Sequence, residues 1–399
     1  MKATAFILVL LVPGFGWAQE VIRSDDFLQG LIEEPGPVRD YTDHRRVRVP
    51  WIQQYQYRTE TDEFDPERQE HALRISPSSP GLHRAQRNLA EHYRRKRSVV
   101  ETDYRNRRIE DAYVAWKELY IREQKLTSYA RLQDVLSDRL IIRQRQTQQS
   151  DADFREVLDM REKLNDLRVR RYELELATRR LREQFGLDST ATVAPDEMLS
   201  VEEIMVQLMS DDATPRDPRL DEYQYERELI EREKALEIAE KRQFLDFVQV
   251  RYNGPHDEVL RERVQLRLGF VLPTSGNRNL KLEELRLEQE ELAREQQVRS
   301  RELEQRTTEQ QRRVRDRIRV YRKFVQVKEE ELRELRALAQ AIAQRQGSDP
   351  DLLLKINEDT EQIRLEKLER QEEIYDAYLE YLVLSGRLFA EPLENHWAN

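Results

Sequence analysis

Two stretches of the chain repeat apolar residues at heptad spacing over lengths that exceed ordinary globular helices. Arg278–Gln346 contains no Gly or Pro, and its second half alternates apolar steps of three and four, which keeps one stripe facing a partner helix. That stripe consists of Ile318, Tyr321, Val325, Lys328, Leu332, Leu335, Ala339 and Ile342. Arg84 to about Gln149 is equally free of helix breakers. At 1.5 Å per residue each stretch predicts a helix about 100 Å long.

Each long stretch is followed by a polar turn and a shorter helical pattern that ends at a glycine. Ser150 or Asp151 can cap a helix that runs to Gly186, because Ser and Asp side chains satisfy free backbone amides there. The turn Gln346–Pro350 similarly leads to a helix from Asp351 to Gly386. Two helices joined by a short turn pack antiparallel. The sequence therefore predicts two long helical hairpins.

Four short segments alternate apolar and polar residues and predict two β-hairpins. Trp51–Arg58 and His71–Ile75 form the first pair, which is the more polar one, and Val248–Tyr252 and Val264–Leu272 form the second. The second pair has one apolar face, made of Val248, Val250, Val264, Leu266, Leu268 and Phe270. We interpret this face as a lipid-facing band, because the opposite face is polar as a water-filled lumen permits. A half-buried periplasmic sheet is the alternative.

The order strand, strand, long helix, turn, shorter helix and Gly occurs twice, about 200 residues apart, which indicates an internal duplication. At one constant offset Trp116 aligns with Tyr321, and Glu123 aligns with Lys328. Four strands cannot close a barrel, whereas three copies would supply twelve. The predicted fold is mainly α: two repeats of a β-hairpin plus a long antiparallel helical hairpin, forming an α-helical barrel with a small β-barrel on trimerisation.

Composition supports solvated coiled coils rather than thick globular cores. Charged residues make up 37% of the chain against 38% hydrophobic residues, and the mean hydropathy is -0.88. The net charge of -10 comes from 78 acidic and 68 basic residues that are largely interspersed, which argues against a nucleic-acid partner. We interpret the basic run Arg94–Arg97 as a solvated helix face.

Candidate catalytic and metal-binding chemistry is sparse in this sequence. The absence of cysteine excludes disulfides, thiolate metal sites and a lipid-anchored N-terminus. The six histidines show neither i,i+4 pairing nor the HExxH spacing of metal sites. Nucleophile–base pairs and phosphate loops are not visible either. We therefore expect no enzymatic activity, no cofactor and no metal.

The N-terminus reads as a secretory signal peptide, with Lys2, an apolar core and a small-x-small cleavage site at Gly16-Trp17-Ala18. No other apolar run approaches 18 residues, so we expect an exported protein without a transmembrane helix. The predicted organisation is a signal peptide at 1–18, an irregular segment at 19–49, a first β-hairpin at 50–81, a first helical hairpin at 82–187, a linking (equatorial) element at 188–217, a helix at 218–243, a second β-hairpin at 244–276, a second helical hairpin at 277–388 and a C-terminal tail at 389–399.

With these elements the chain resembles the TolC family of outer-membrane efflux proteins over roughly Pro50–Gly386. The resemblance is carried by the signal peptide and by Val49-Pro50-Trp51-Ile52, Glu110-Asp111-Ala112-Tyr113, Pro218-Arg219-Leu220 and Gly347-Ser348-Asp349 before Leu352-Leu353. The family normally opens with a long helix before the first strand, the counterpart of Leu220–Arg242 in the second half. In this chain Pro35-Gly36-Pro37 interrupts the corresponding segment.

The resemblance implies a homotrimer with a β-barrel in outer-membrane lipid and a helical barrel crossing the periplasm. It also implies that the hairpin tips meet a periplasmic adaptor that connects to an inner-membrane pump. Carried over by position, the tip residues are Thr147, Ser150, Asp151, Asp153, Gln346, Gly347, Ser348 and Asp349.

Charged residues near the tips and in the seams allow two interpretations each. Glu156, Asp159 and Asp351, together with the tip aspartates, could form an acidic ring at the periplasmic mouth or serve as helix caps and dipole partners. Glu123 and Lys328 could form an ion pair between the hairpins or lie solvated on helix flanks. Aromatic seam residues such as Trp116 are expected to pack rather than to bind a ligand.

The sequence thus favours a TolC-like outer-membrane channel subunit that gives passive passage for efflux or secretion driven by a partner pump. The alternative is a soluble periplasmic coiled-coil scaffold that has the helical hairpins without a pore.

Overall fold

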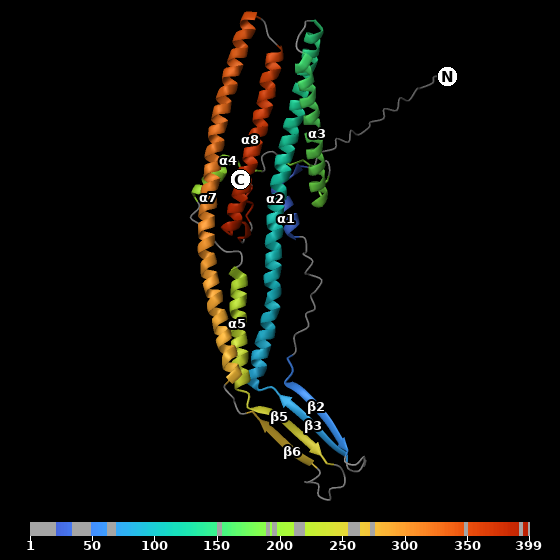
Figure 1. Cartoon of the computed structure of the whole chain (residues 1–399), viewed down its shortest axis with the longest axis vertical. Helices are drawn as coiled ribbons and strands as arrows, with labels where there is room; N and C mark the ends of the chain where they lie inside the picture. Colours follow the sequence, from blue (N-terminus) through green and yellow to red (C-terminus); the bar gives the residue numbers. More distant parts are fainter. Residues whose placement is uncertain are drawn as a thin grey trace, which may run out of the picture.

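Two long helical hairpins run side by side in the computed structural model, and a small sheet lies at one end of them (Figure 1). The structure describes residues 21–33, 49–61, 69–149, 154–188, 192–193, 198–210, 220–253, 264–271, 276–346, 350–390 and 394–397. The predicted signal peptide, residues 1–18, lies outside this set.

The two predicted long helices are confirmed, and each begins a few residues earlier than expected. Their shorter partners return beside them, and each return ends at a glycine in the left-handed region: Gly186 has φ 65° and Gly386 has φ 71°, a conformation that glycine adopts without strain. Among the described helices, none is long and apolar enough to cross a bilayer. The bounds are α2 Pro80–Gln149, α3 Phe154–Gln184, α7 Gly276–Gln346 and α8 Pro350–Leu384.

The four predicted strands are also confirmed, and they join into one antiparallel sheet in the order β2–β3–β5–β6. Strands β3 and β5 belong to different repeats, so the sheet ties the two repeats together. Helix α5 (Leu220–Lys241) leads into β5 and packs between α2 and α7 (Figure 1). The strands are β2 Ile52–Thr61, β3 Gln69–Pro77, β5 Leu245–Tyr252 and β6 Val264–Phe270.

The main hydrophobic core lies at mid-height, where α2, α7 and α8 meet the linking element. Helix α4 (Val201–Met209), in the linking element, starts with a capping box in which the side chains of Ser200 and Glu203 satisfy each other's backbone amides. Trp116 is completely buried in this core and half-buried Tyr321 packs against it, so the prediction that the aromatic seam packs is confirmed.

Both ends of the described chain differ from the prediction. The segment 19–49 was expected to be irregular, but it contains β1 (Val21–Ile22), which pairs with β4 (Thr192–Val193), and helix α1 (Ser24–Glu33). Phe27 of α1 packs on Trp116 with ring centroids 5.3 Å apart. A 3-10 helix, η3 (Arg387–Phe389), leads into the expected tail at 389–399, and Trp397 of this tail is completely buried. Such short segments take their stability from tertiary packing rather than from local pattern, which explains the error.

Candidate functional site

One face of the sheet is apolar across all four strands. The register pairs Tyr57 with Leu73, Leu73 with Val250, and Val250 with Leu266, and directly paired residues share a face. All four of these side chains are exposed, Leu266 to 65%. The next row holds Tyr55, Ile75, Val248 and Leu268, and Val264 and Phe270 continue the face along β6.

The six band residues predicted from the second hairpin therefore lie together, and the apolar face extends onto the first hairpin. The sequence described that hairpin as polar because Arg58, Thr59 and Glu60 end its first strand. The pairing of β2 with β3, and of β3 with β5, places Tyr55 and Tyr57 in the apolar rows, whereas Arg58 and Glu60 point to the opposite face.

Aromatic rings flank the apolar rows at both ends. At the end near the helices, the rings of Phe244 and Phe270 lie 5.0 Å apart. At the far end the His71 ring lies 6.0 Å from that of Tyr57 and 6.3 Å from that of Tyr252, and the Tyr57 hydroxyl is 2.8 Å from His71 Nδ1. Aromatic girdles around an apolar band are typical of strands that cross a bilayer.

The opposite face of the sheet is charged and internally paired. Arg74 of β3 lies 3.2 Å from the Asp246 carboxylate of β5 and 3.7 Å above the Phe247 ring, and Arg251 of β5 forms an ion pair with Glu70 of β3. Both ion pairs join the two repeats. A sheet with an apolar face and a face of charged pairs has the two surfaces that lipid and water each require.

The outer edges of the sheet are open. Within the described strands, β2 pairs only with β3 and β6 pairs only with β5, so one edge of each presents unpaired backbone groups. An open edge is a template for another strand. The sheet can therefore continue onto a further copy at either side.

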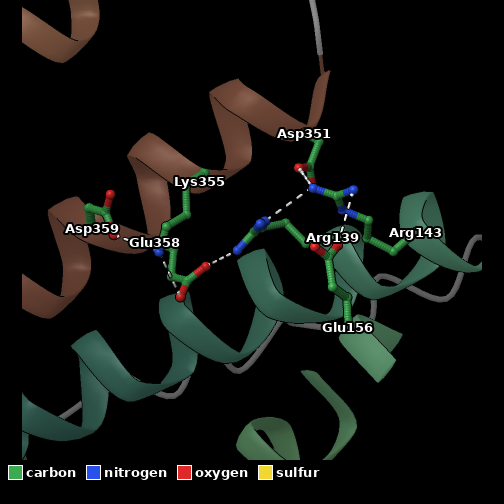
Figure 2. A network of polar contacts seen from close by, with 7 residues as sticks. All are labelled: Arg139, Arg143, Glu156, Asp351, Lys355, Glu358 and Asp359. Carbon is green, nitrogen blue, oxygen red and sulfur yellow. Dashed lines mark hydrogen bonds and ion pairs between the residues drawn. The ribbon is translucent and has the colours of Figure 1, made fainter. Parts of the chain in front are cut away.

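The second feature is an ion-pair network near the hairpin tips, which joins α2 to α8 (Figure 2). Arg139 of α2 forms ion pairs with Asp351, at 3.3 Å, and with Glu358. Arg143, one turn further along α2, lies 2.6 Å from Asp351 and 3.2 Å from Glu156 of α3. The Arg139, Asp351 and Glu358 side chains are all buried.

Lys355 extends this network along α8. Its ammonium lies 3.3 Å from Glu358 and 2.9 Å from Asp359. Burial lowers the pKa of Arg139, but the hydrogen bond to Asp351 and the charge of Glu358 outweigh that effect and raise it overall. The guanidinium therefore stays charged and links α2 of one hairpin to α8 of the other near the tips.

No protein-family model matches the sequence, and no curated protein matches it, but several solved structures share its fold. One is a membrane protein from Pseudomonas aeruginosa, at TM-score 0.60 and 11% identity over 96% of this chain and 97% of that one. Another is the open state of the MtrE outer membrane channel of Neisseria gonorrhoeae, at TM-score 0.59 and 11% identity over 92% and 89%. The Campylobacter jejuni CmeC outer membrane channel matches at TM-score 0.53 and 11% identity over 86% and 78%.

The chain has the TolC fold. The identities are low, so the likeness establishes the fold alone, and it extends over 86–96% of this chain. The fold class predicted from the sequence is confirmed.

The structure places the predicted tip residues unevenly. Thr147 lies in the last turn of α2, where its hydroxyl donates to the Arg143 carbonyl at 2.8 Å, and Gln346 is the last residue of α7. The remaining tip residues, Ser150, Asp151, Asp153, Gly347, Ser348 and Asp349, lie outside the described residues. Their contact with an adaptor stays a prediction.

Asp351, one candidate for the acidic mouth, does not lie on an exposed rim of the protomer. That carboxylate is buried between Arg139 and Arg143, because it faces the neighbouring hairpin rather than solvent. Glu156 is exposed but paired with Arg143, and Asp159 is exposed one turn further along α3. Only the latter two remain candidates for an exposed acidic rim.

The ion pair between Glu123 and Lys328, one of the two interpretations of these residues, does not form within the protomer. Glu123 forms an ion pair with Arg182 at 2.5 Å and accepts the backbone amide of Val193 at 2.9 Å. Lys328 pairs with Glu331 on its own helix at 2.8 Å. Equivalent positions in a duplicated chain need not touch, and here α8 contacts α2 and α7 instead.

Sequence reasoning missed the Arg139 network, although a signal for it exists. Arg139 and Arg143 are four residues apart on α2, and Asp351, Lys355, Glu358 and Asp359 recur at helical spacing on α8, so each set lies on one helix face. The sequence does not show that these two faces meet.

Proposed function

We propose that the chain is one subunit of a trimeric outer-membrane channel. The observation that carries this proposal is the sheet, in which an aromatic-flanked apolar face lies opposite a face of charged pairs. A soluble sheet would bury its apolar face under helices of its own chain, yet Tyr57, Leu73, Val250 and Leu266 are exposed. Lipid on one side and water on the other satisfy both faces.

A trimer follows from the number of strands and the open edges. A closed barrel requires about eight or more strands, and each copy supplies four to this sheet. Three copies joined from β6 of one to β2 of the next give twelve strands with every edge paired. The helices above the sheet then form a ring that continues the barrel into a tube.

The mechanism is passive passage along this tube for efflux or secretion. The charged face of the sheet lines the outer-membrane section of the lumen, and the energy comes from a partner pump in the inner membrane. We propose that a periplasmic adaptor binds the hairpin tips around Thr147 and Gln346. The N-terminal signal peptide directs export, most of the chain lies in the periplasm, and no catalytic step is assigned to any residue.

Fractionation of cells that express the full chain, followed by planar-bilayer recording, tests this proposal. A channel predicts detergent-extractable, heat-modifiable trimers in the outer membrane and stepwise conductance after reconstitution. Recovery of the protein in the soluble periplasmic fraction, without conductance, would instead establish the coiled-coil scaffold and refute the channel.

A further inference from the structure

The two repeats differ in the half of the molecule nearest the sheet. In the second repeat, α5 precedes β5 and packs between α2 and α7. In the first repeat, the described residues contain no helix directly before β2; α1 ends at Glu33 and packs with α2 at mid-height. Above the sheet order β2–β3–β5–β6, the described helices are therefore α2 over β3, α5 over β5 and α7 over β6 (Figure 1).

As a result, one face of α7 has no partner among the described residues of the protomer. Leu280, Leu287 and Val298 are exposed to 70%, 65% and 56% and are separated by 7 and 11 residues, which places them on one helix face. Gln289 and Leu285 face α5: Gln289 accepts a hydrogen bond from Lys234, and Leu285 is buried. Leu287 lies two residues from each, about 200° around the helix.

The charges along α2 and α7 are complementary. From Pro80 to Arg108, α2 carries nine basic and three acidic residues, including the run Arg94–Arg97. From Leu280 to Val298, α7 carries six acidic and three basic residues. The same attraction already operates inside the protomer, where Arg95 of α2 lies 3.1 Å from Glu228 of the acidic helix α5.

We infer that the Leu280–Leu287–Val298 face of α7 docks directly on the basic, sheet-proximal half of α2 in a second copy of this chain. The inference rests on the proposed trimer. When β6 of one copy pairs with β2 of the next, α7 stands beside the helix-side end of β2. The nearest described helix of the next copy is then α2. Arginine stems of α2 then cover the apolar stripe while their guanidinium groups meet the flanking glutamates.

The consequence is an uneven tube. Near the sheet each copy contributes α2, α5 and α7 to the ring, whereas toward the tips it contributes α2, α3, α7 and α8 (Figure 1). A heterologous contact of this kind closes into a ring when the rotation between neighbouring copies is one third of a turn. The sheet-proximal section is accordingly the one with fewer helices around its circumference.

Disulfide cross-linking tests the contact cleanly because the chain has no cysteine. Ala90 lies ten residues beyond the start of α2, and Leu287 lies eleven residues beyond the start of α7, so both stand about 15 Å above the sheet. His92 faces α5, because its Nε2 atom is hydrogen-bonded to the Tyr225 carbonyl of α5 at 2.9 Å. Ala90 lies two residues away, about 200° around the helix, and is therefore on the side of α2 away from α5.

The double variant A90C/L287C is predicted to form reducible covalent trimers on mild oxidation in the outer membrane. The matched variant A90C/L338C, with its second cysteine near the far end of α7, should stay monomeric on the same gel. Trimers that conduct while A90C/L287C fails to cross-link would overturn the docking alone. Cross-linking of L287C to Y41C instead would also overturn it, because the segment before β2 would then separate α7 from α2 of the next copy. If the protein without introduced cysteines forms no trimers and shows no conductance, the proposed channel itself is refuted.

Discussion

Replacement of Arg139 by Met tests whether the buried network holds the two hairpins together. The substitution keeps most of the side-chain volume but leaves the buried Glu358 and Asp351 carboxylates without their shared guanidinium. Removing one partner of a buried ion pair costs about 3–5 kcal/mol. Lys355 and Arg143 still contact these acids, so we expect the lower end of that range, about 3 kcal/mol.

Hydrogen exchange measured by mass spectrometry reports this loss locally. A cost of about 3 kcal/mol corresponds to roughly a hundredfold faster exchange of amides in the first turns of α8, while amides in the Trp116 core stay protected. The control is Lys328→Met, which removes the surface pair with Glu331 and should leave exchange unchanged. Equal exchange in both variants would show that the network contributes nothing to hairpin packing. The excess cost of R139M should shrink in combination with E358Q, because the two residues share one interaction.

Three further predictions concern the sheet and the core. Leu266→Arg, on the apolar face, should cost about 2–4 kcal/mol of bilayer insertion and reduce outer-membrane trimers, whereas Gln265→Arg on the charged face should not; equal yields would refute the assignment of faces. Gly269→Ala places a Cβ 2.1 Å from a ring carbon of Phe247 on the neighbouring strand and should reduce the amount of trimer in the outer membrane, measured by immunoblot. Gly81→Ala meets nothing within 4 Å and should leave that amount unchanged. Burial raises the pKa of Tyr113 to about 12, whereas the unfolded chain loses the same proton near the ordinary tyrosine pKa of about 10. The unfolding free energy should therefore fall as pH rises from about 10 to 12. Tyr113→Phe should flatten that slope when denaturation is measured as a function of pH.

The regular elements were predictable because local rules determine them. Long runs without Gly or Pro predicted α2 and α7, and strict alternation predicted β5 and β6. Gly186 and Gly386 marked the equivalent ends of two helices because a left-handed residue is needed there. In each case the information lies within a few residues of the element that it specifies.

Features that depend on distant contacts were not predictable. Helix α1 and Trp397 are ordered by a core assembled from both hairpins: the Asn395 amide, beside Trp397, donates to Ser24 Oγ at 2.8 Å, and the Tyr113 hydroxyl donates to the Glu394 carbonyl at 2.8 Å. Asp351 was one candidate for an acidic rim because it lies near the hairpin tip in the sequence, and only the packing of α8 against α2 shows that it is buried.

Electron cryo-microscopy of the detergent-extracted particle tests the central claim most directly. The account predicts three copies around one axis, with β6 of each paired to β2 of the next, the rows containing Val250 and Leu266 facing the detergent belt, and a continuous lumen along the helices. A monomeric particle whose helices cover that apolar face would contradict it.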